Sequence, residues 1–501
     1  MTTSAVIAVN RFGLGAKPGE ISRAQADPRA WLRAQIRGAR AVPESIATLP
    51  SSQAIFGEYT EAIGLRRDRR RAQRDSQMAA TDSTRGDTGD DRQVDAQGEP
   101  PVPSAEAVAQ GIRQVLAPKY QQQVAARYQF AATTDEPFRE RLIHFWTNHF
   151  AVSTDKRIVL GLAGALENEA VRPAVHGRFV DMVLAAERHP AMILYLDNQQ
   201  SVGPNSQAAR NAARRATNTG VNRKVGLNEN LAREILELHT LGIGGYSQTD
   251  VTTFAEILTG WSIDGGRGAL GGGGGWVATD EPGAFIFRDQ IHEPGAKTLL
   301  GKRYAEGGES QAEAVLRDLA AHPATATHIA TKLVRHFVAD EPPADAIAKV
   351  AKAFRDSEGD LPSVHGAVID LAAAWREPYA KFKTPHEFVI STFRALDFIP
   401  KRPNQIAAPF ELLGQRPYTP GSPAGWADIA SQWDGADALM KRIEWATSIA
   451  ERSRSRIDPL SIATVALGKE LGDHTRTAIS RAASAAQALT LLLMSPEFQR
   501  R

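Results

Sequence analysis

The stretch "NENLAREILELHTLG", residues 228–242, has the pattern that decides the fold. Its apolar residues recur at three- and four-residue intervals, which predicts a helix with one buried face. Strand-like alternation is scarce, and its best example is "GAFIFRDQ" (283–290). We therefore predict a mainly α fold, a large multi-helix assembly with a small β or irregular element around residues 264–305. The helical spacing recurs in "FRERLIHFWTNHF" (138–150), "GRFVDMVLAAERHP" (177–190), "HIATKLVRHFVAD" (328–340), "ADAIAKVAKAFRDS" (344–357) and "AAQALTLLLMSPEF" (485–498).

The length and composition are those of a large globular protein. The chain has 501 residues, of which 42% are hydrophobic and 23% charged, so it is long enough for more than one core. Residues 198–226 are polar and rich in Asn, Gly and Arg, which predicts a long loop. Changes in composition predict an N-terminal helical segment (1–64), a charged insertion expected to be disordered (65–104), a core helical region with the polar motifs (105–263), a glycine-rich loop with a small β element (264–305) and a C-terminal helical region (306–501).

The charge balance and the absence of cysteine exclude several classes of function. A net charge of +2 gives no general attraction to nucleic acid, and the basic run within 65–104 is interleaved with aspartate. No apolar run approaches the roughly 20 residues that span a bilayer. Without cysteine the chain has no disulfide, thiolate nucleophile or cysteine-bound metal. The apolar patch Ala5–Val9 is short and has no basic residue before it, so we expect the protein to be cytoplasmic or exported with a partner.

The polar residues of 228–242 form a candidate site. At about 100° per residue, one helix face contains Asn230, Arg233, Glu234 and Glu237. His239 would point away from that face. Two carboxylates one turn apart can act as acid and base when they line a cleft, or bind a divalent cation together. An i, i+4 pair such as Arg233–Glu237 is equally ordinary on an exposed helix, so a solvated surface is the alternative.

Four other polar clusters offer candidate site residues, and Asp197, Asn198, His149 and His292 among them are candidates for the walls of the same cleft. Each also has a simpler interpretation as a turn, a helix cap or a buried polar group. The clusters are Asp197 and Asn198 in "YLDNQQSVGPNS" (195–206), Trp146 and His149 in "HFWTNHFAVS" (144–153), His292 and Lys297 in "HEPGAKTLLGK" (292–302), and Lys383, His386 and Arg394 in "KTPHEFVISTFRAL" (383–396). His144 and His149 are five residues apart and do not match the metal-binding H-E-x-x-H spacing. No G-x-S-x-G nucleophile elbow and no P-loop lysine motif is present.

These motifs together resemble one bacterial family, domain of unknown function 1800. The resemblance runs nearly the full length of the chain, but it implies no established activity. Such proteins are often encoded beside a second uncharacterised family, number 1501, which commonly carries a twin-arginine leader, so a member of that family is a candidate partner. The stretches that carry the resemblance include "RLIHFWTNHFAVS", "YLDNQQSVGPNS", "LNENLAREILELHTLGIGGYSQTDV", "LTGWS", "HEPGAKTLLGK", "HPATATHIATKLVRHFVAD", "FKTPHEFVISTFRAL", "LGQRPYTPGSPAGW" and "LLMSPEFQ". Thr147 stands where the family often has the first of two histidines, and "HEPGAK" is a variant of the family's HDPGPK-like turn.

Two hypotheses about function follow. In the first, the protein is an enzyme, a hydrolase or lyase acting on a polysaccharide-like polymer, with Trp146 and Trp261 stacking on sugar rings. Its catalytic residues would be Glu234, Glu237 and Asp197, and its substrate contacts would be Trp146, His149, Asn198, Asn230, Arg233, Trp261, His292 and Lys297. No cofactor is required by the sequence, and a divalent cation at the carboxylates is an option. In the second hypothesis, the chain is a non-catalytic scaffold or partner of a family 1501 protein.

Overall fold

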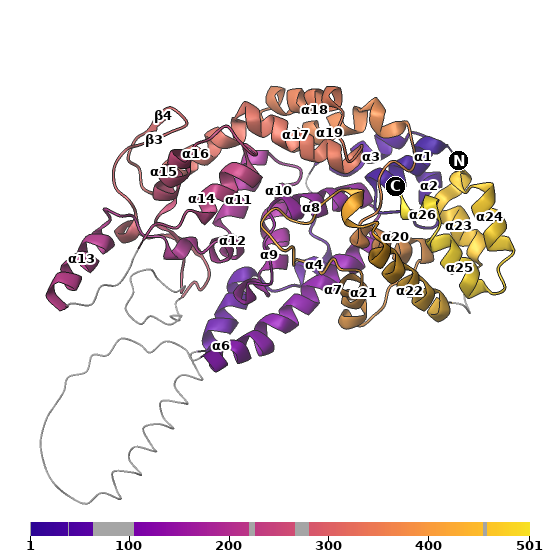
Figure 1. Cartoon of the computed structure of the whole chain (residues 1–501), viewed down its shortest axis with the longest axis horizontal. Helices are drawn as coiled ribbons and strands as arrows, with labels where there is room; N and C mark the ends of the chain where they lie inside the picture. Colours follow the sequence, from indigo (N-terminus) through magenta and orange to yellow (C-terminus); the bar gives the residue numbers. More distant parts are fainter. Residues whose placement is uncertain (1, 39, 64–104, 220–225, 266–279, 454–457) are drawn as a thin grey trace, which may run out of the picture.

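The computed structural model of the protein describes residues 2–38, 40–63, 105–219, 226–265, 280–453 and 458–501 (Figure 1). The charged insertion predicted at 65–104 and most of the glycine-rich loop lie outside the described residues.

The fold is mainly α, as the spacing of apolar residues predicts (Figure 1). An additional helix covers residues 52–63. The labelled α-helices are α1 (Thr3–Ile7), α2 (Glu20–Ala24), α3 (Pro28–Ile36), α4 (Glu44–Ala47), α6 (Ala105–Gly111), α7 (Ala117–Thr133), α8 (Pro137–His149), α9 (Ala163–Leu166), α10 (Arg172–Ala174), α11 (Phe179–Arg188), α12 (Pro190–Tyr195), α13 (Gln207–Thr219), α14 (Asn230–Glu234), α15 (Gln248–Leu258), α16 (Glu309–Ala321), α17 (Pro323–Phe337), α18 (Ala344–Asp356), α19 (Leu361–Asp370), α20 (Pro385–Leu396), α21 (Pro403–Leu412), α22 (Ala436–Ser453), α23 (Pro459–Leu467), α24 (Asp473–Ser480), α25 (Ala485–Leu493) and α26 (Pro496–Gln499).

Several helices are joined or extended by tighter and wider turns. The π-helical turns are unusual, because such turns are rare and often lie at functional positions. They comprise Ala8–Phe12, Ile112–Leu116, Glu167–Val171 and Ile235–His239. The 3₁₀ turns are Arg157–Val159, Asn198–Gln200, Asp289–Ile291, Ala372–Trp375, Ala430–Gln432 and Gly468–Glu470.

Local sequence signals fix where the important helices begin. Thr384 and Glu387 form a reciprocal capping box at the start of α20, with Pro385 in the first turn. The ring of His322 accepts a hydrogen bond from the backbone of Ala324 and caps α17 in a similar way. These caps satisfy backbone N–H groups that have no partner within the helix, so both helix starts are fixed in place.

The small β element is present and consists of two antiparallel pairs. β1 (Trp261–Ile263) pairs with β2 (Phe285–Phe287), and β3 (Lys297–Leu299) pairs with β4 (Lys302–Tyr304). β1 begins just before the predicted boundary at residue 264. The β3–β4 pair packs against α15 and α16 at one end of the molecule (Figure 1), and β1 packs against α12 and the turn Asn198–Gln200.

One buried apolar cluster extends through the molecule and includes residues from Ala5 to Phe498. α17, α18 and α19 form a layer, from which α17 and α19 contact α8 through aromatic side chains. α22 to α25 lie at the opposite end of the molecule from β3 and β4 (Figure 1). Within the described ranges, no helix is both long and apolar enough to cross a membrane.

The prediction of a long loop over 198–226 is wrong for its central part. Residues Gln207–Thr219 form α13, and the Ser206 hydroxyl accepts a hydrogen bond from the backbone N–H of Ala209 at 3.2 Å. The segment is rich in alanine and arginine, which favour helix. The segment is polar because its helix is largely exposed to solvent, and the polarity does not indicate a loop.

Candidate functional site

The two glutamates predicted to be catalytic lie on a partly exposed surface. α14 ends at Glu234, and Ile235–His239 continue as a π-helical turn, so the assumed 100° spacing does not hold beyond Glu234. The Tyr246 hydroxyl donates a hydrogen bond to Glu237 at 2.9 Å. Burial raises the pKa of Glu234, and the nearby charge of Glu237 adds to that effect. The two carboxylates are therefore electrostatic neighbours, but neither lines the main cavity of the described structure.

The other residues of that face make contacts with neighbouring polar side chains. Arg233 forms its i, i+4 ion pair with Glu229, at 3.0 Å, in place of one with Glu237. Arg233 also donates a hydrogen bond to the side chain of Gln248 at 2.9 Å. Asn230 is exposed at the start of α14. This part of the face is a solvated surface network.

The helix start does meet the 195–206 segment, through Asn228. The Asn228 amide donates to the carbonyl oxygens of Leu196 and Asp197 at 3.2 and 3.3 Å. Asp197 has a left-handed backbone, with φ of 58°, and its carboxylate pairs with Lys156 at 2.5 Å. The carboxylate of Asp197 is therefore already neutralised by a neighbouring ammonium.

Asn198 and His292 act as buried connectors. The Asn198 amide donates to the carbonyl oxygens of Leu258 and Trp261 at 3.1 and 2.9 Å. The His292 ring donates from Nδ1 to the carbonyl of Thr259 at 2.8 Å. Lys297 donates to the carbonyl oxygen of Pro294 at 2.8 Å. The bonds of Asn198 and His292 hold their segments against the end of α15 and the start of β1, whereas the Lys297 bond stays within its own turn.

The two tryptophans predicted to stack on a sugar are both core residues. Trp146 and Trp261 are each 0% exposed. The Trp146 indole donates from Nε1 to His365 at 3.1 Å. Stacking on a substrate requires an open ring face, and neither ring has one, so this part of the prediction has no support in the structure.

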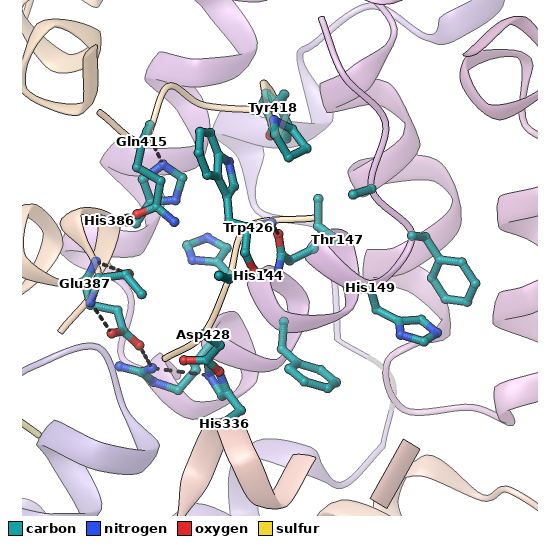
Figure 2. A pocket seen from close by; sticks show the side chains of 18 of the residues that line it. His144, Thr147, His149, His336, His386, Glu387, Gln415, Tyr418, Trp426 and Asp428 are labelled. Atoms are coloured by element: carbon teal, nitrogen blue, oxygen red, sulfur yellow. Dashed lines mark hydrogen bonds and ion pairs between the residues drawn. The ribbon is translucent and has the colours of Figure 1, made fainter. Parts of the chain in front are cut away.

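A cavity of about 250 Å³ lies elsewhere, between α8, α17, the start of α20 and the loop 413–428 (Figure 2). We call it the histidine cavity. Of the site residues predicted for the first hypothesis, His149 lines it. The polar side chains that line it include His144, His149, Lys332, Arg335, His336, His386, Glu387, Tyr418, Trp426 and Asp428.

The loop 413–428 is fixed against the end of α8. The Asn148 side chain donates to the carbonyl of Trp426 at 2.9 Å and accepts from its backbone N–H at 2.7 Å. Gly425 has φ of 80°, and a Cβ there would lie 2.3 Å from the carbonyl oxygen of Asn148. Only glycine allows this approach. The loop therefore holds Trp426 at the cavity in a defined position.

His336 and Asp428 form a hydrogen-bonded pair across the cavity wall (Figure 2). The His336 Nδ1 lies 2.5 Å from the Asp428 Oδ2. The Nε2 lies 3.4 Å from Arg141, and because an arginine can only donate, Nε2 accepts and Nδ1 carries the proton that goes to Asp428. Burial lowers the pKa of His336 despite the opposing effect of Asp428. The imidazole is therefore neutral at neutral pH, with its tautomer set by the carboxylate.

The carboxylates at the cavity are held ionised by buried cations. Burial raises the pKa of Glu387, but Arg501 and Arg141 outweigh it and hold that pKa well below its usual range. Arg501 lies 2.8 Å from Glu387, and Arg141 is also in contact with it. The pKa of Asp428 is likewise lowered, since the pull of His336, Lys381 and Arg501 exceeds the effect of burial. Neither carboxylate can supply a proton at neutral pH.

Two further histidines on the cavity wall are neutral. Burial lowers the pKa of His144, and it lowers that of His386 well below the ordinary range. His386 donates from Nε2 to the carbonyl oxygen of Gln415 at 2.7 Å. Figure 2 shows His144 and Trp426 near the centre of the view, with His386 beside Gln415. The cavity thus combines neutral proton acceptors with one partly exposed indole.

The cationic side of the cavity is formed by α17. Lys332, Arg335 and His336 occupy positions i, i+3 and i+4 of that helix, so they share a face. Burial lowers the pKa of Lys332 to about 8, and the nearby charge of Arg335 also lowers it. The Nε of Arg335 donates to the carbonyl of Asp340 at 3.3 Å.

The described residues offer no ligand set for a metal ion. No group of three or more His, Cys, Asp or Glu among them is arranged to hold one. The option of a divalent cation at Glu234 and Glu237 therefore gains nothing from the arrangement of these side chains.

Four stretches of the sequence outside residues 228–242 contribute side chains to the histidine cavity. "HFWTNHF", "KLVRHFVAD", "FKTPHEF" and "LGQRPYTPGSPAGW" are four of the stretches on which the family resemblance rests, and all four contribute cavity residues. Each is rich in histidine, tryptophan or charged residues. Their spacing along the chain gives no indication that they meet, because their contacts are made between distant segments.

Comparison with known proteins agrees with the family resemblance. A family model described as "Protein of unknown function (DUF1800)" matches residues 7–500. No curated protein and no solved structure matches the chain.

Proposed function

Because the chain belongs to the DUF1800 family, whose description names no activity, we propose a function from the site alone. The protein is an enzyme that cleaves a polysaccharide-like polymer by acid–base chemistry in the histidine cavity. The observation that carries this proposal is the His336–Asp428 pair, at 2.5 Å. A carboxylate that orients a neutral imidazole is a recurring arrangement for a general base.

His336 is the proton acceptor in this proposal. Its neutral form is favoured by burial. Among the residues that the structure describes, its Nε2 has only a long contact, to Arg141 at 3.4 Å. A substrate hydroxyl, a water or an acidic C–H can displace such a weak contact. Asp428 stays ionised and stabilises the imidazolium that forms. That imidazolium then gives its proton to the departing sugar oxygen, so the proton balance of the step closes on His336.

Trp426 is the sugar contact in this proposal, in place of the buried Trp146 and Trp261. Its indole lines the cavity and is partly exposed, and the bonds from Asn148 fix its backbone. The Nε1 of Trp426 is buried and has no hydrogen-bond partner in the described part of the chain. An aromatic face beside a free donor suits a ring that carries hydroxyl groups.

The test is an assay of the protein on a panel of neutral and acidic polysaccharides, in which the release of reducing ends measures cleavage. We expect wild-type protein to cleave at least one polymer, and His336→Asn and Asp428→Asn each to lose about 10²- to 10⁴-fold in rate. His474→Asn is the matched control, because His474 is exposed on α24 and away from the cavity. Thermal unfolding of every variant separates loss of the site from loss of the fold.

Two results contradict the proposal. One is wild-type protein that is inert across the whole panel, which would favour the non-catalytic partner role. The other is a His336→Asn variant as active as His474→Asn.

A further inference from the structure

Some of the cationic side chains around the histidine cavity have a carboxylate partner, and others do not. Arg127 is paired with Glu167, and Arg141 with Glu387. Glu387 also takes Arg501 at 2.8 Å. The carboxylates near the cavity are therefore already engaged with buried guanidinium groups.

Asp428 is engaged in the same way. It accepts from His336 and lies 3.5 Å from the Lys381 ammonium and 3.7 Å from Arg501. Lys381 is in addition paired with Asp340. No carboxylate that lines the cavity remains for a further cation.

Lys332 and Arg335 are the cations left over on this wall. Within the described ranges, no hydrogen bond or ion pair joins Lys332 to another residue, and no carboxylate pairs with Arg335. Both are partly buried and line the cavity. A partly buried ammonium with an incomplete counter-charge is costly. Burial and the charge of Arg335 lower the pKa of Lys332 to about 8, and the nearby Asp428, which His336 and Lys381 already engage, offsets only part of that cost.

His149 provides a second unused group on the same cavity. It is 1% exposed, and its Nε2 donates to the carbonyl oxygen of His239 at 3.1 Å. Its other nitrogen, Nδ1, therefore has no proton and is an acceptor, and it is buried without a partner among the described residues. A ligand that supplies a hydroxyl beside an anionic group would satisfy all these groups together.

We propose that Lys332 and Arg335 bind an anionic group of the substrate, so that the substrate class is an acidic saccharide bearing a carboxylate or a sulfate ester. This inference rests on the proposed function for its saccharide part. The ammonium and guanidinium bind the anion by charge-assisted hydrogen bonds, and the Nδ1 of His149 accepts from a neighbouring hydroxyl. The anion restores the charge balance that the protein's own carboxylates leave incomplete.

The experiment measures binding and not turnover, so that it is independent of cleavage. Isothermal titration calorimetry uses the His336→Asn protein with a trigalacturonate, a sulfated trisaccharide and an uncharged trisaccharide. We expect one or both acidic probes to bind at least tenfold more tightly than the uncharged one, and the tighter acidic probe identifies carboxylate or sulfate as the anion. Lys332→Met and Arg335→Gln, each added to His336→Asn, should weaken acidic-probe binding by about tenfold or more.

Lys349→Met is the matched control, because it removes an exposed ammonium on α18 that lies outside the cavity. It should leave binding unchanged. Circular dichroism melting of each variant shows whether the fold is intact, and the Arg335→Gln result stands if Lys332→Met unfolds.

The inference is overturned if neither acidic probe binds, if the uncharged probe binds as tightly, or if both cavity variants bind like Lys349→Met. Acidic-probe binding that depends on Lys332 and Arg335, in a wild-type protein that cleaves nothing, supports the inference and rejects the proposed function instead.

Discussion

The Nε2 of His149 donates a hydrogen bond to the carbonyl oxygen of His239 at 3.1 Å. His149 ends α8 and lines the histidine cavity, and His239 ends the π-helical turn that follows α14. The His239 ring is fully buried and lies 2.7 Å from Glu187. The bond thus joins the helix that carries Glu234 and Glu237 to the wall of the cavity.

Replacing His149 by phenylalanine tests this connection. The substitution keeps an aromatic ring but removes the donor, so the carbonyl of His239 is left unpaired in the interior. We expect the free energy of unfolding to fall by about 1–3 kcal/mol, measured by urea denaturation. His474→Phe, at an exposed position, should change it by less than about 0.5 kcal/mol. Equal stability of the two variants would contradict the role of the bond.

Acid stability should depend on His365. Its ring is fully buried and accepts a hydrogen bond from Trp146, and burial lowers its pKa from 6.5 to about 3. Between these values the unfolded chain binds a proton that the folded chain does not, so the free energy of unfolding falls as the pH falls through that window. The contribution of one such group is at most about 1.4 kcal/mol per pH unit.

His365→Gln keeps an acceptor for Trp146 and removes the titrating ring. We expect its urea midpoint to fall less steeply than that of wild type as the pH is lowered from neutral toward 4. Parallel pH profiles of the two proteins would show that His365 does not contribute to acid sensitivity.

Lys383 should be a costly residue at neutral pH. It is 2% exposed, donates to the Ser391 hydroxyl at 3.1 Å, and burial lowers its pKa from 10.5 to about 7. The unfolded chain keeps this proton up to a higher pH, so stability rises with pH between about 7 and 10.5 and the full cost is present below that window.

Lys383→Met has a similar length and no charge. We expect it to raise the free energy of unfolding by about 1–3 kcal/mol at neutral pH, with a smaller gain at alkaline pH, as measured by thermal and urea unfolding. The exposed substitution Lys349→Met should have little effect. A loss of stability at every pH would show that packing of the lysine outweighs the burial of its charge.

Glu234 should be slightly unfavourable for folding at neutral pH. Burial raises its pKa above 4.5, so the folded chain binds a proton more readily than the unfolded chain, and the cost of the charge is present above that pH. Because the side chain is only half-buried, solvent screens most of this effect. Glu234→Gln should therefore raise the free energy of unfolding by less than about 1 kcal/mol, and a lower urea midpoint would contradict this.

Much of the fold follows from local sequence patterns. The three- and four-residue spacing in 138–150 and 328–340 predicts helices there, and α8 and α17 cover most of those segments, ending at His149 and Phe337. The alternation in 283–290 predicts a strand, and β2 lies within it. The error at 198–226 arose because polar residues were interpreted as a loop, although alanine and arginine favour helix in that composition.

The candidate site was harder to predict, for two physical reasons. The placement of side chains on one face of 228–242 requires an uninterrupted α-helix, but a π-helical turn begins at Ile235. The cavity is made by contacts such as His336 with Asp428, which are 92 residues apart. A helical repeat reports neighbours within one or two turns, so no spacing rule connects these residues. Burial also decides which aromatic rings a ligand can reach, because it removes Trp146 from any surface and leaves Trp426 partly exposed.

The walls of the histidine cavity come from segments that lie far apart in the sequence, and this has a consequence for synthesis of the chain. α8 ends at His149, and the loop that carries Asp428 follows 279 residues later. At about 5–20 residues per second of translation, the α8 wall emerges from the ribosome on the order of tens of seconds before its partners exist. During that interval Arg141 has no Glu387 to pair with. The nascent α8 surface must therefore stay in water, or be covered by a chaperone, until α20 and the loop arrive.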